Sequence, residues 1–120
     1  MSTVESVELA GRGQLAADPV ELSMRLLAAR GCFRPIRRLE AAAPGKLRLD
    51  VLAFNEAREE YLFVIATRRA QIFQALLNLL SSDLAAELAR DGVRFECHVW
   101  SACPRGLVAE VIAFTPDDWK

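Results

Sequence analysis

Two segments of this chain are apolar on both faces that a β-strand can present. In residues 60–67 and 107–114, side chains of either parity are mostly apolar, and Glu110 is the only charged residue of the second segment. Because successive side chains of a strand point to opposite faces of its sheet, such strands must be covered on both sides. Helices, another sheet or a second subunit could provide that cover.

Two further segments carry the signals of helices. Residues 18–30 begin with an Asp-Pro pair, which suits the N-cap and the first helical position, and end before Gly31. Residues 69–90 contain apolar residues at helical spacing, and residues 81–83 could divide them into two helices. The stripe consists of Phe73, Leu76, Leu80, Leu84 and Leu88. Other apolar residues widen it, so we expect this helical segment to be covered on more than one side.

The order of the elements predicts an α+β fold. We expect an antiparallel sheet of about five strands with two helices packed mainly on one face. Strands are predicted at residues 47–54 and 93–101 in addition to the two apolar segments, and residues 32–43, which contain Pro35, form at most an edge strand. The alternative is a ferredoxin-like βαββαβ sheet with one extra strand, which requires the N-terminal segment to pair and residues 32–43 not to pair.

The length of 120 residues is that of one ordinary domain. We expect a single domain over residues 18–116, a flexible arm or short edge strand over residues 1–17, and a tail over residues 117–120. With two helical segments to cover several apolar strand faces, a second subunit is expected to cover part of the sheet. The protein is therefore predicted to be a homodimer.

The charge and the N-terminus limit the expected partners and location. The net charge is −1, which argues against a surface that coats nucleic acid, so nucleic acid is not an expected partner. The first residues include acidic side chains and no apolar run, and no segment approaches the roughly 20 apolar residues that cross a bilayer. We expect a cytoplasmic protein with reduced cysteines and no membrane partner.

The only histidine and two of the three cysteines lie close together in the sequence. Cys97 and His98 are neighbours on a predicted strand, so their side chains should point to opposite faces and cannot share a metal or form a nucleophile–base pair. Cys103 lies beside Pro104 and Arg105 in a predicted loop, and a nearby cation can lower the pKa of a thiol, so Cys103 is the candidate reactive thiol. No close pair of metal ligands such as Cys-x-x-Cys occurs, and no metal, cofactor or catalytic residue is predicted.

The other face of the same predicted strand carries residues that are typical of protein interfaces. A tryptophan among charged residues is unusual on a wet sheet face, whereas Trp and Arg often anchor interfaces. The predicted interaction surface consists of Arg94, His98, Trp100 and, from the tail, Trp119. The alternative is that a helix packs over this face.

A second candidate surface is basic. An Arg-lined cleft for an anion or a small molecule would use Arg34, Arg37, Arg38, Arg68 and Arg69. The alternative interpretation is a solvated sheet edge whose charges prevent edge-to-edge pairing.

The sequence favours a non-catalytic protein-interaction module, a homodimer that binds another protein as an adaptor, chaperone or regulator. The alternative function is a small-molecule or anion-binding domain with an Arg-lined cleft, which could be an enzyme. No Gly-rich phosphate loop, Gly-x-Ser-x-Gly elbow or His-Glu-x-x-His motif occurs in the sequence.

Overall fold

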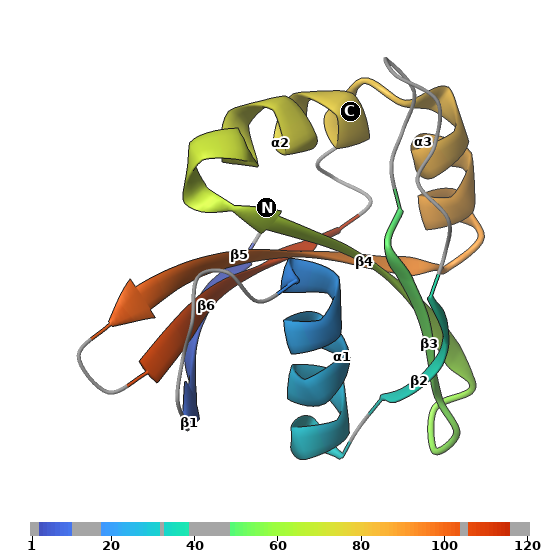
Figure 1. Cartoon of the computed structure of the whole chain (residues 1–120). Helices are drawn as coiled ribbons and strands as arrows, with labels where there is room; N and C mark the ends of the chain where they lie inside the picture. The colour runs from blue at the N-terminus through green and yellow to red at the C-terminus, as the bar shows by residue number, and fades with distance from the viewer. Residues whose placement is uncertain (1–2, 11–17, 32, 39–48, 104–105, 116–120) are drawn as a thin grey trace.

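A computed structural model describes residues 3–10, 18–31, 33–38, 49–103 and 106–115 of the chain (Figure 1). The strands are β1 (Thr3–Ala10), β2 (Arg34–Arg38), β3 (Val51–Asn55), β4 (Glu60–Arg68), β5 (Arg94–Cys103) and β6 (Gly106–Phe114). The helices are α1 (Pro19–Arg30), the short 3-10 helix η1 (Arg69–Gln71), α2 (Ile72–Leu80) and α3 (Asp83–Arg90).

All six strands belong to one sheet in the order β1-β6-β5-β4-β3-β2. The predicted α+β fold with one sheet is confirmed. The sheet is mixed because β4 pairs with β5 in parallel, and every other pair is antiparallel. A parallel pair needs a crossover connection, and η1, α2 and α3 provide it. Both candidate edge strands form, since β1 pairs with β6 and β2 pairs with β3.

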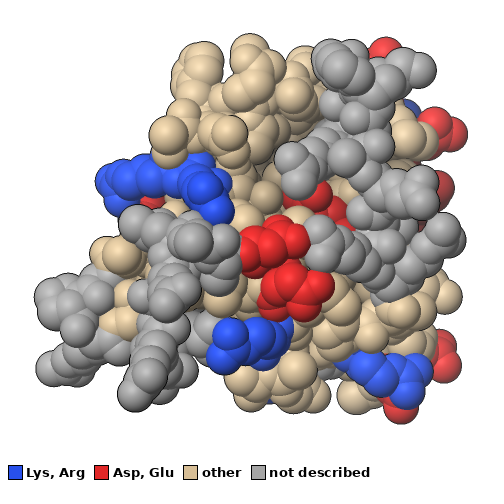
Figure 2. Space-filling view, viewed as in Figure 1, with Lys and Arg blue, Asp and Glu red and all other residues tan. Residues whose placement is uncertain are grey.

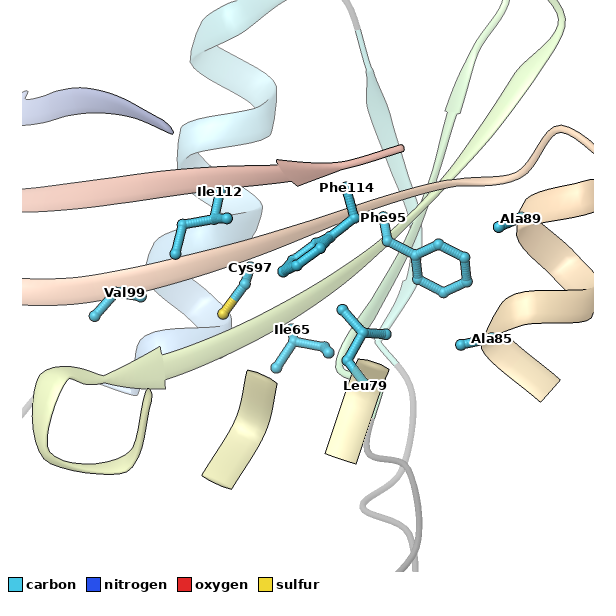
Figure 3. Close-up of a cluster of buried hydrophobic side chains, with 9 residues drawn as sticks. All are labelled: Ile65, Leu79, Ala85, Ala89, Phe95, Cys97, Val99, Ile112 and Phe114. Carbon is cyan, nitrogen blue, oxygen red and sulfur yellow. The ribbon is translucent and has the colours of Figure 1, made fainter. Parts of the chain in front are cut away.

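The helices cover both faces of the sheet, in contrast to the expectation that they lie mainly on one. Figure 1 shows α1 on one side of the sheet and α2 and α3 on the other. On the α1 side, Leu22 and Leu26 pack with Trp100 and Leu107 in one of the core clusters. On the opposite side, a second cluster joins β4, β5 and β6 to α2 and α3 (Figure 3). Its buried residues are Ile65, Leu79, Ala85, Ala89, Phe95, Cys97, Val99, Ile112 and Phe114.

This arrangement explains the strands that are apolar on both faces. In β4, Val64 packs on the α1 side and Ile65 packs on the side of α2 and α3. The helices of one chain therefore cover central strand β4 on both sides. The sheet itself does not require the second subunit that the strand pattern suggested.

Local sequence signals set the helix ends. The Asp18 carboxylate accepts a hydrogen bond from the Val20 backbone N–H at 3.0 Å, and Gly31 ends α1 with a left-handed φ of 71°. The second helical segment is divided, because the Ser82 hydroxyl accepts from the Ala85 N–H at 3.2 Å and caps α3. The segments 69–80 and 83–90 are bent by 68° at this break.

Within the described ranges, no single helix is long and apolar enough to cross a membrane. The bent pair formed by residues 69–80 and 83–90 meets the length and composition criteria only when both helices are counted together.

Candidate interaction surface and buried polar network

Two residues of the predicted interaction surface are buried. His98 is 0% exposed and Trp100 is 1% exposed, because α1 packs over the face of β5 that carries them. This corrects the expectation that they contact a partner, and the alternative of a covering helix describes their environment. Arg94 is exposed at the start of β5 and lies 3.5 Å from Glu60. Trp119 lies outside the described residues.

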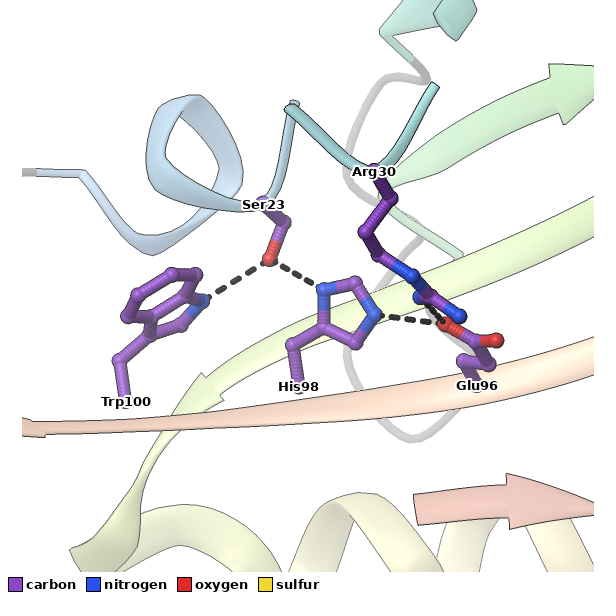
Figure 4. Close-up of polar contacts among 5 residues, drawn as sticks. All are labelled: Ser23, Arg30, Glu96, His98 and Trp100. Carbon is purple, nitrogen blue, oxygen red and sulfur yellow. Dashed lines mark hydrogen bonds and ion pairs between the residues drawn. The ribbon is translucent and has the colours of Figure 1, made fainter. Parts of the chain in front are cut away.

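The buried face instead carries a continuous chain of polar contacts (Figure 4). The indole N–H of Trp100 donates to Ser23 Oγ of α1 at 2.9 Å, and Ser23 Oγ lies 2.9 Å from His98 Nδ1. On the other side of the imidazole, His98 Nε2 lies 2.9 Å from Glu96 Oε1. The guanidinium of Arg30 donates to the same carboxylate oxygen at 2.9 Å. We refer to these five residues as the polar network.

The hydrogen-bond partners indicate which nitrogen carries the proton when the imidazole of His98 is neutral. A carboxylate only accepts, so His98 Nε2 carries the proton that is donated to Glu96. His98 Nδ1 then accepts from the Ser23 hydroxyl, which in turn accepts from the Trp100 indole. Every polar group in this row of hydrogen bonds has a partner, which is the condition for burying such groups at low energetic cost.

The carboxyl group of Glu96 is held in its charged form. Burial alone would raise its pKa, but the hydrogen bonds from His98 and Arg30 and the positive charge of Arg30 outweigh that effect, and the pKa is lowered. The anion therefore remains at neutral pH beneath α1. It connects the last residue of α1 to the middle of the sheet.

The order Ser23, His98, Glu96 has the composition of a nucleophile, a base and an orienting acid. However, Ser23 and His98 are both 0% exposed, and the Ser23 oxygen already accepts from Trp100. A substrate carbonyl has no approach to this hydroxyl. The arrangement fastens α1 to β5 and does not form a catalytic site. A serine among the apolar residues of α1 is the sequence signal that could have revealed it.

Cys97 lies on the opposite face of β5, as strand parity predicted. It belongs to the cluster beneath α2 and α3, whereas His98 contacts Ser23 of α1. Burial and then the negative charge of Asp50 raise the pKa of the Cys97 thiol to about 12. Cys103 is the last residue of β5, and its side chain lies outside what the structure describes. Among the described residues, no group of three or more His, Cys, Asp and Glu side chains could hold a metal ion.

The candidate anion-binding arginines whose side chains are described, Arg34, Arg68 and Arg69, do not lie together in one cleft. Arg34 of β2 pairs with Phe54 of β3, which in turn pairs with Tyr61 near the start of β4. Arg68 is the last residue of β4, so the positions of Arg34 and Arg68 are separated by roughly 23 Å along the strand direction. Arg34 lies 2.9 Å from Glu56, and Arg69 lies 3.1 Å from Glu110. Figure 2 shows the basic side chains of this view in separate groups, with acidic side chains between them. The side chains of Arg37 and Arg38, both on β2, lie outside the described residues.

An apolar surface that the sequence did not assign to a site lies on the outer side of α2. We call it the α2 surface; its members are Phe73, Leu77 and Leu80, which are 78%, 51% and 41% exposed. They share one side of the helix, since they are spaced by four and three residues. Together with Leu76 and Ser81 they line a shallow hollow of about 370 Å³. Leu84 of α3, which is 56% exposed, follows four residues after Leu80.

The opposite side of α2 faces the core. Leu79 is fully buried there, and Ile72, Ala75 and Leu76 pack against the same cluster. The sequence predicted that this helical segment is covered on more than one side. Among the described residues, only one side of α2 is covered. The outer side is an apolar surface without a partner among the described residues.

A separate cavity of about 340 Å³ lies between the end of β4 and the start of α2. Its polar lining consists of Thr67, Gln71, Gln74 and Asn78, and the Gln74 amide donates to Asn78 at 2.8 Å. No charged side chain is among the described residues that line it.

Comparison with protein-family models, with curated proteins and with solved structures finds no match for this chain.

Proposed function

We propose that this protein is a non-catalytic protein-interaction module that binds another polypeptide through the α2 surface. The observation that carries the proposal is the exposure of Phe73, Leu77 and Leu80 on one side of a helix whose other side is buried in the core. Contiguous apolar surface of this kind on a folded domain is typical of a docking site. Amphipathic helices commonly dock by anchors at this spacing.

The chemistry of the other candidate sites supports a role without catalysis. Ser23, His98 and Trp100 of the polar network are shielded from solvent, and the raised pKa of Cys97 leaves its thiol protonated. Two of the candidate anion-binding arginines lie in ion pairs with acids, Arg34 with Glu56 and Arg69 with Glu110. These contacts give less support to an anion-binding domain than the α2 surface gives to a docking module. We place the module in the cytoplasm, where its thiols stay reduced.

Site-specific photo-crosslinking in the cells that produce the protein tests this proposal. A photoreactive phenylalanine analogue at position 73 should give a covalent adduct with a protein. The same analogue at position 36 is the matched control, because Ile36 is a half-exposed apolar residue on the distant edge strand β2. No adduct at position 73, or equal yields at both positions, would contradict docking through the α2 surface.

A further inference from the structure

The α2 surface is uncharged. From residue 70 to residue 82 the chain contains no Asp, Glu, Lys or Arg. In Figure 2 the region over α2, at the top of the view, shows neither basic nor acidic colouring. A twofold-symmetric interface brings one patch against an identical copy, so any charge at its centre would face a like charge. The α2 surface meets this requirement for self-association.

The shape of the α2 surface also allows it to pair with itself. Phe73 projects into solvent at one end of the hollow, and Leu77 and Leu80 line the hollow towards its other end. Phe73 and Leu80 are separated by about 10 Å along the helix axis. If two α2 helices pack antiparallel about a twofold axis near Leu77, Phe73 of each copy meets the Leu80 end of the hollow in the other. One surface thus supplies both the projecting ring and the site that receives it.

Polar groups beside the apolar residues are compatible with the same pairing. Gln74 and Asn78 lie on α2 next to the α2 surface, and their side-chain amides are hydrogen-bonded to each other at 2.8 Å. An amide carries both donors and acceptors. Two identical copies can therefore exchange hydrogen bonds at the rim of the interface without an unpaired charge.

A lipid surface fits the same region less well. Helices that lie on membranes usually carry Lys and Arg beside their apolar side. Arg68 and Arg69 precede α2, but Arg69 lies in an ion pair with Glu110. The residues that follow α2 are mostly acidic, since Asp83, Glu87 and Asp91 accompany a single basic residue, Arg90. An anionic bilayer would repel this part of the molecule.

We infer that the α2 surface binds a second copy of this chain and forms a twofold-symmetric dimer with antiparallel α2 helices. This inference rests on the proposed docking function and names its partner. Exposed apolar patches of monomers measure roughly 300–600 Å², so two copies would bury roughly 600–1,200 Å² in total, at the low end of specific interfaces. The expected dimer is therefore weak and reversible.

Sedimentation equilibrium of the purified chain tests the dimer directly. The apparent mass should rise from 13.3 kDa towards twice that value as the protein concentration increases. Phe73→Glu should weaken the dimer at least tenfold and leave the circular dichroism spectrum unchanged, because the substituted side chain is 78% exposed. Ile36→Glu, a matched exposed substitution on β2, should leave the dimer intact. A monomer at every concentration, or a dimer that survives Phe73→Glu, overturns the inference.

A mixing experiment tests the antiparallel arrangement. In the predicted dimer, position 73 of one copy faces position 80 of the other, so Phe73→Glu mixed with Leu80→Lys gives one Glu–Lys pair and one unchanged Phe–Leu pair. The mixture should form heterodimers at least tenfold more tightly than either variant pairs with itself. Equal weakness of the mixture and of the separate variants overturns the arrangement.

The failure of this inference can be distinguished from the failure of the proposed function. A monomer in solution together with a photo-crosslinked adduct at position 73 to a different protein leaves docking in place and overturns the dimer. Binding of the purified chain to anionic phospholipid vesicles that Phe73→Glu abolishes would replace the protein partner with a lipid surface. An adduct of twice the chain mass supports both the docking function and the dimer.

Discussion

His98 donates a hydrogen bond to the carboxylate of Glu96, two residues earlier on the same strand, across 2.9 Å. Neighbours of the same parity on a strand point to the same face, so β5 presents an acid, an imidazole and an indole in a row beneath α1. The side chain of Ser23 meets the last two of these groups, and Arg30 meets the first. The packing of α1 thus depends on hydrogen bonds from both its middle and its last residue.

Replacing Ser23 with alanine should destabilise the protein by about 1–3 kcal/mol, because a buried indole N–H loses its acceptor and a buried imidazole nitrogen loses its donor. Urea unfolding of Ser23→Ala measures the change. The control is Ser6→Ala, since Ser6 is exposed on β1 and its loss should alter the free energy of unfolding by less than about 0.5 kcal/mol. Equal stabilities of the two variants would show that the polar network does not hold α1 in place.

The charged form of Glu96 should make stability depend on pH. The pKa of this carboxyl is lower in the folded state than its ordinary value of 4.5, so below that value the unfolded chain binds a proton that the folded chain does not. The contribution of Glu96 is therefore present above about pH 4.5 and is lost as the pH falls through the lowered folded pKa.

Urea unfolding between pH 3 and pH 5 measures this dependence in the wild type and in Glu96→Gln. The amide of the variant can still accept from His98 and Arg30 but does not titrate. The free energy of unfolding should fall more steeply with decreasing pH in the wild type than in the variant. Parallel curves would mean that Glu96 titrates alike in the folded and unfolded chains.

Local signals in the sequence predicted the elements better than their contacts. The cap at Asp18 and the glycine at position 31 gave α1, because both act within one turn of the helix. Strand parity placed Cys97 and His98 on opposite faces, because it depends only on the alternation of the backbone. The α+β class followed from the order of these elements.

The features that were not predicted depend on contacts distant in the sequence. No local pattern states whether α1 or a partner covers Trp100, and the deciding residue, Ser23, lies 77 positions away. The parallel pairing of β4 with β5 likewise depends on how the chain crosses between them. The division of the helical segment into α2 and α3 was allowed by the sequence but not required by it.

The thiol of Cys97 should not react in the folded protein. Its pKa of about 12 leaves almost no thiolate at pH 8, and the side chain is fully buried. A variant with Cys32→Ser and Cys103→Ser has Cys97 as its only thiol, and Ellman's reagent should label it only after urea is added. Labelling of the folded variant within minutes would show that the core beneath α2 and α3 opens readily.

The break between α2 and α3 offers a matched pair of adjacent serines. The Ser82 hydroxyl accepts from the Ala85 N–H at the start of α3, whereas the Ser81 hydroxyl donates to the Leu77 carbonyl at the exposed end of α2. Because an N-cap serves a helix N–H that otherwise has no partner, Ser82→Ala should lower the free energy of unfolding by about 1 kcal/mol. Ser81→Ala should change it by less than about 0.5 kcal/mol, since solvent can replace an exposed hydroxyl.

The two variants, compared by urea unfolding, test whether α3 begins at Asp83 as a separate helix. A larger loss from Ser81→Ala would mean that α2 continues past Leu80, and the 68° bend between the two segments would then lack its cause.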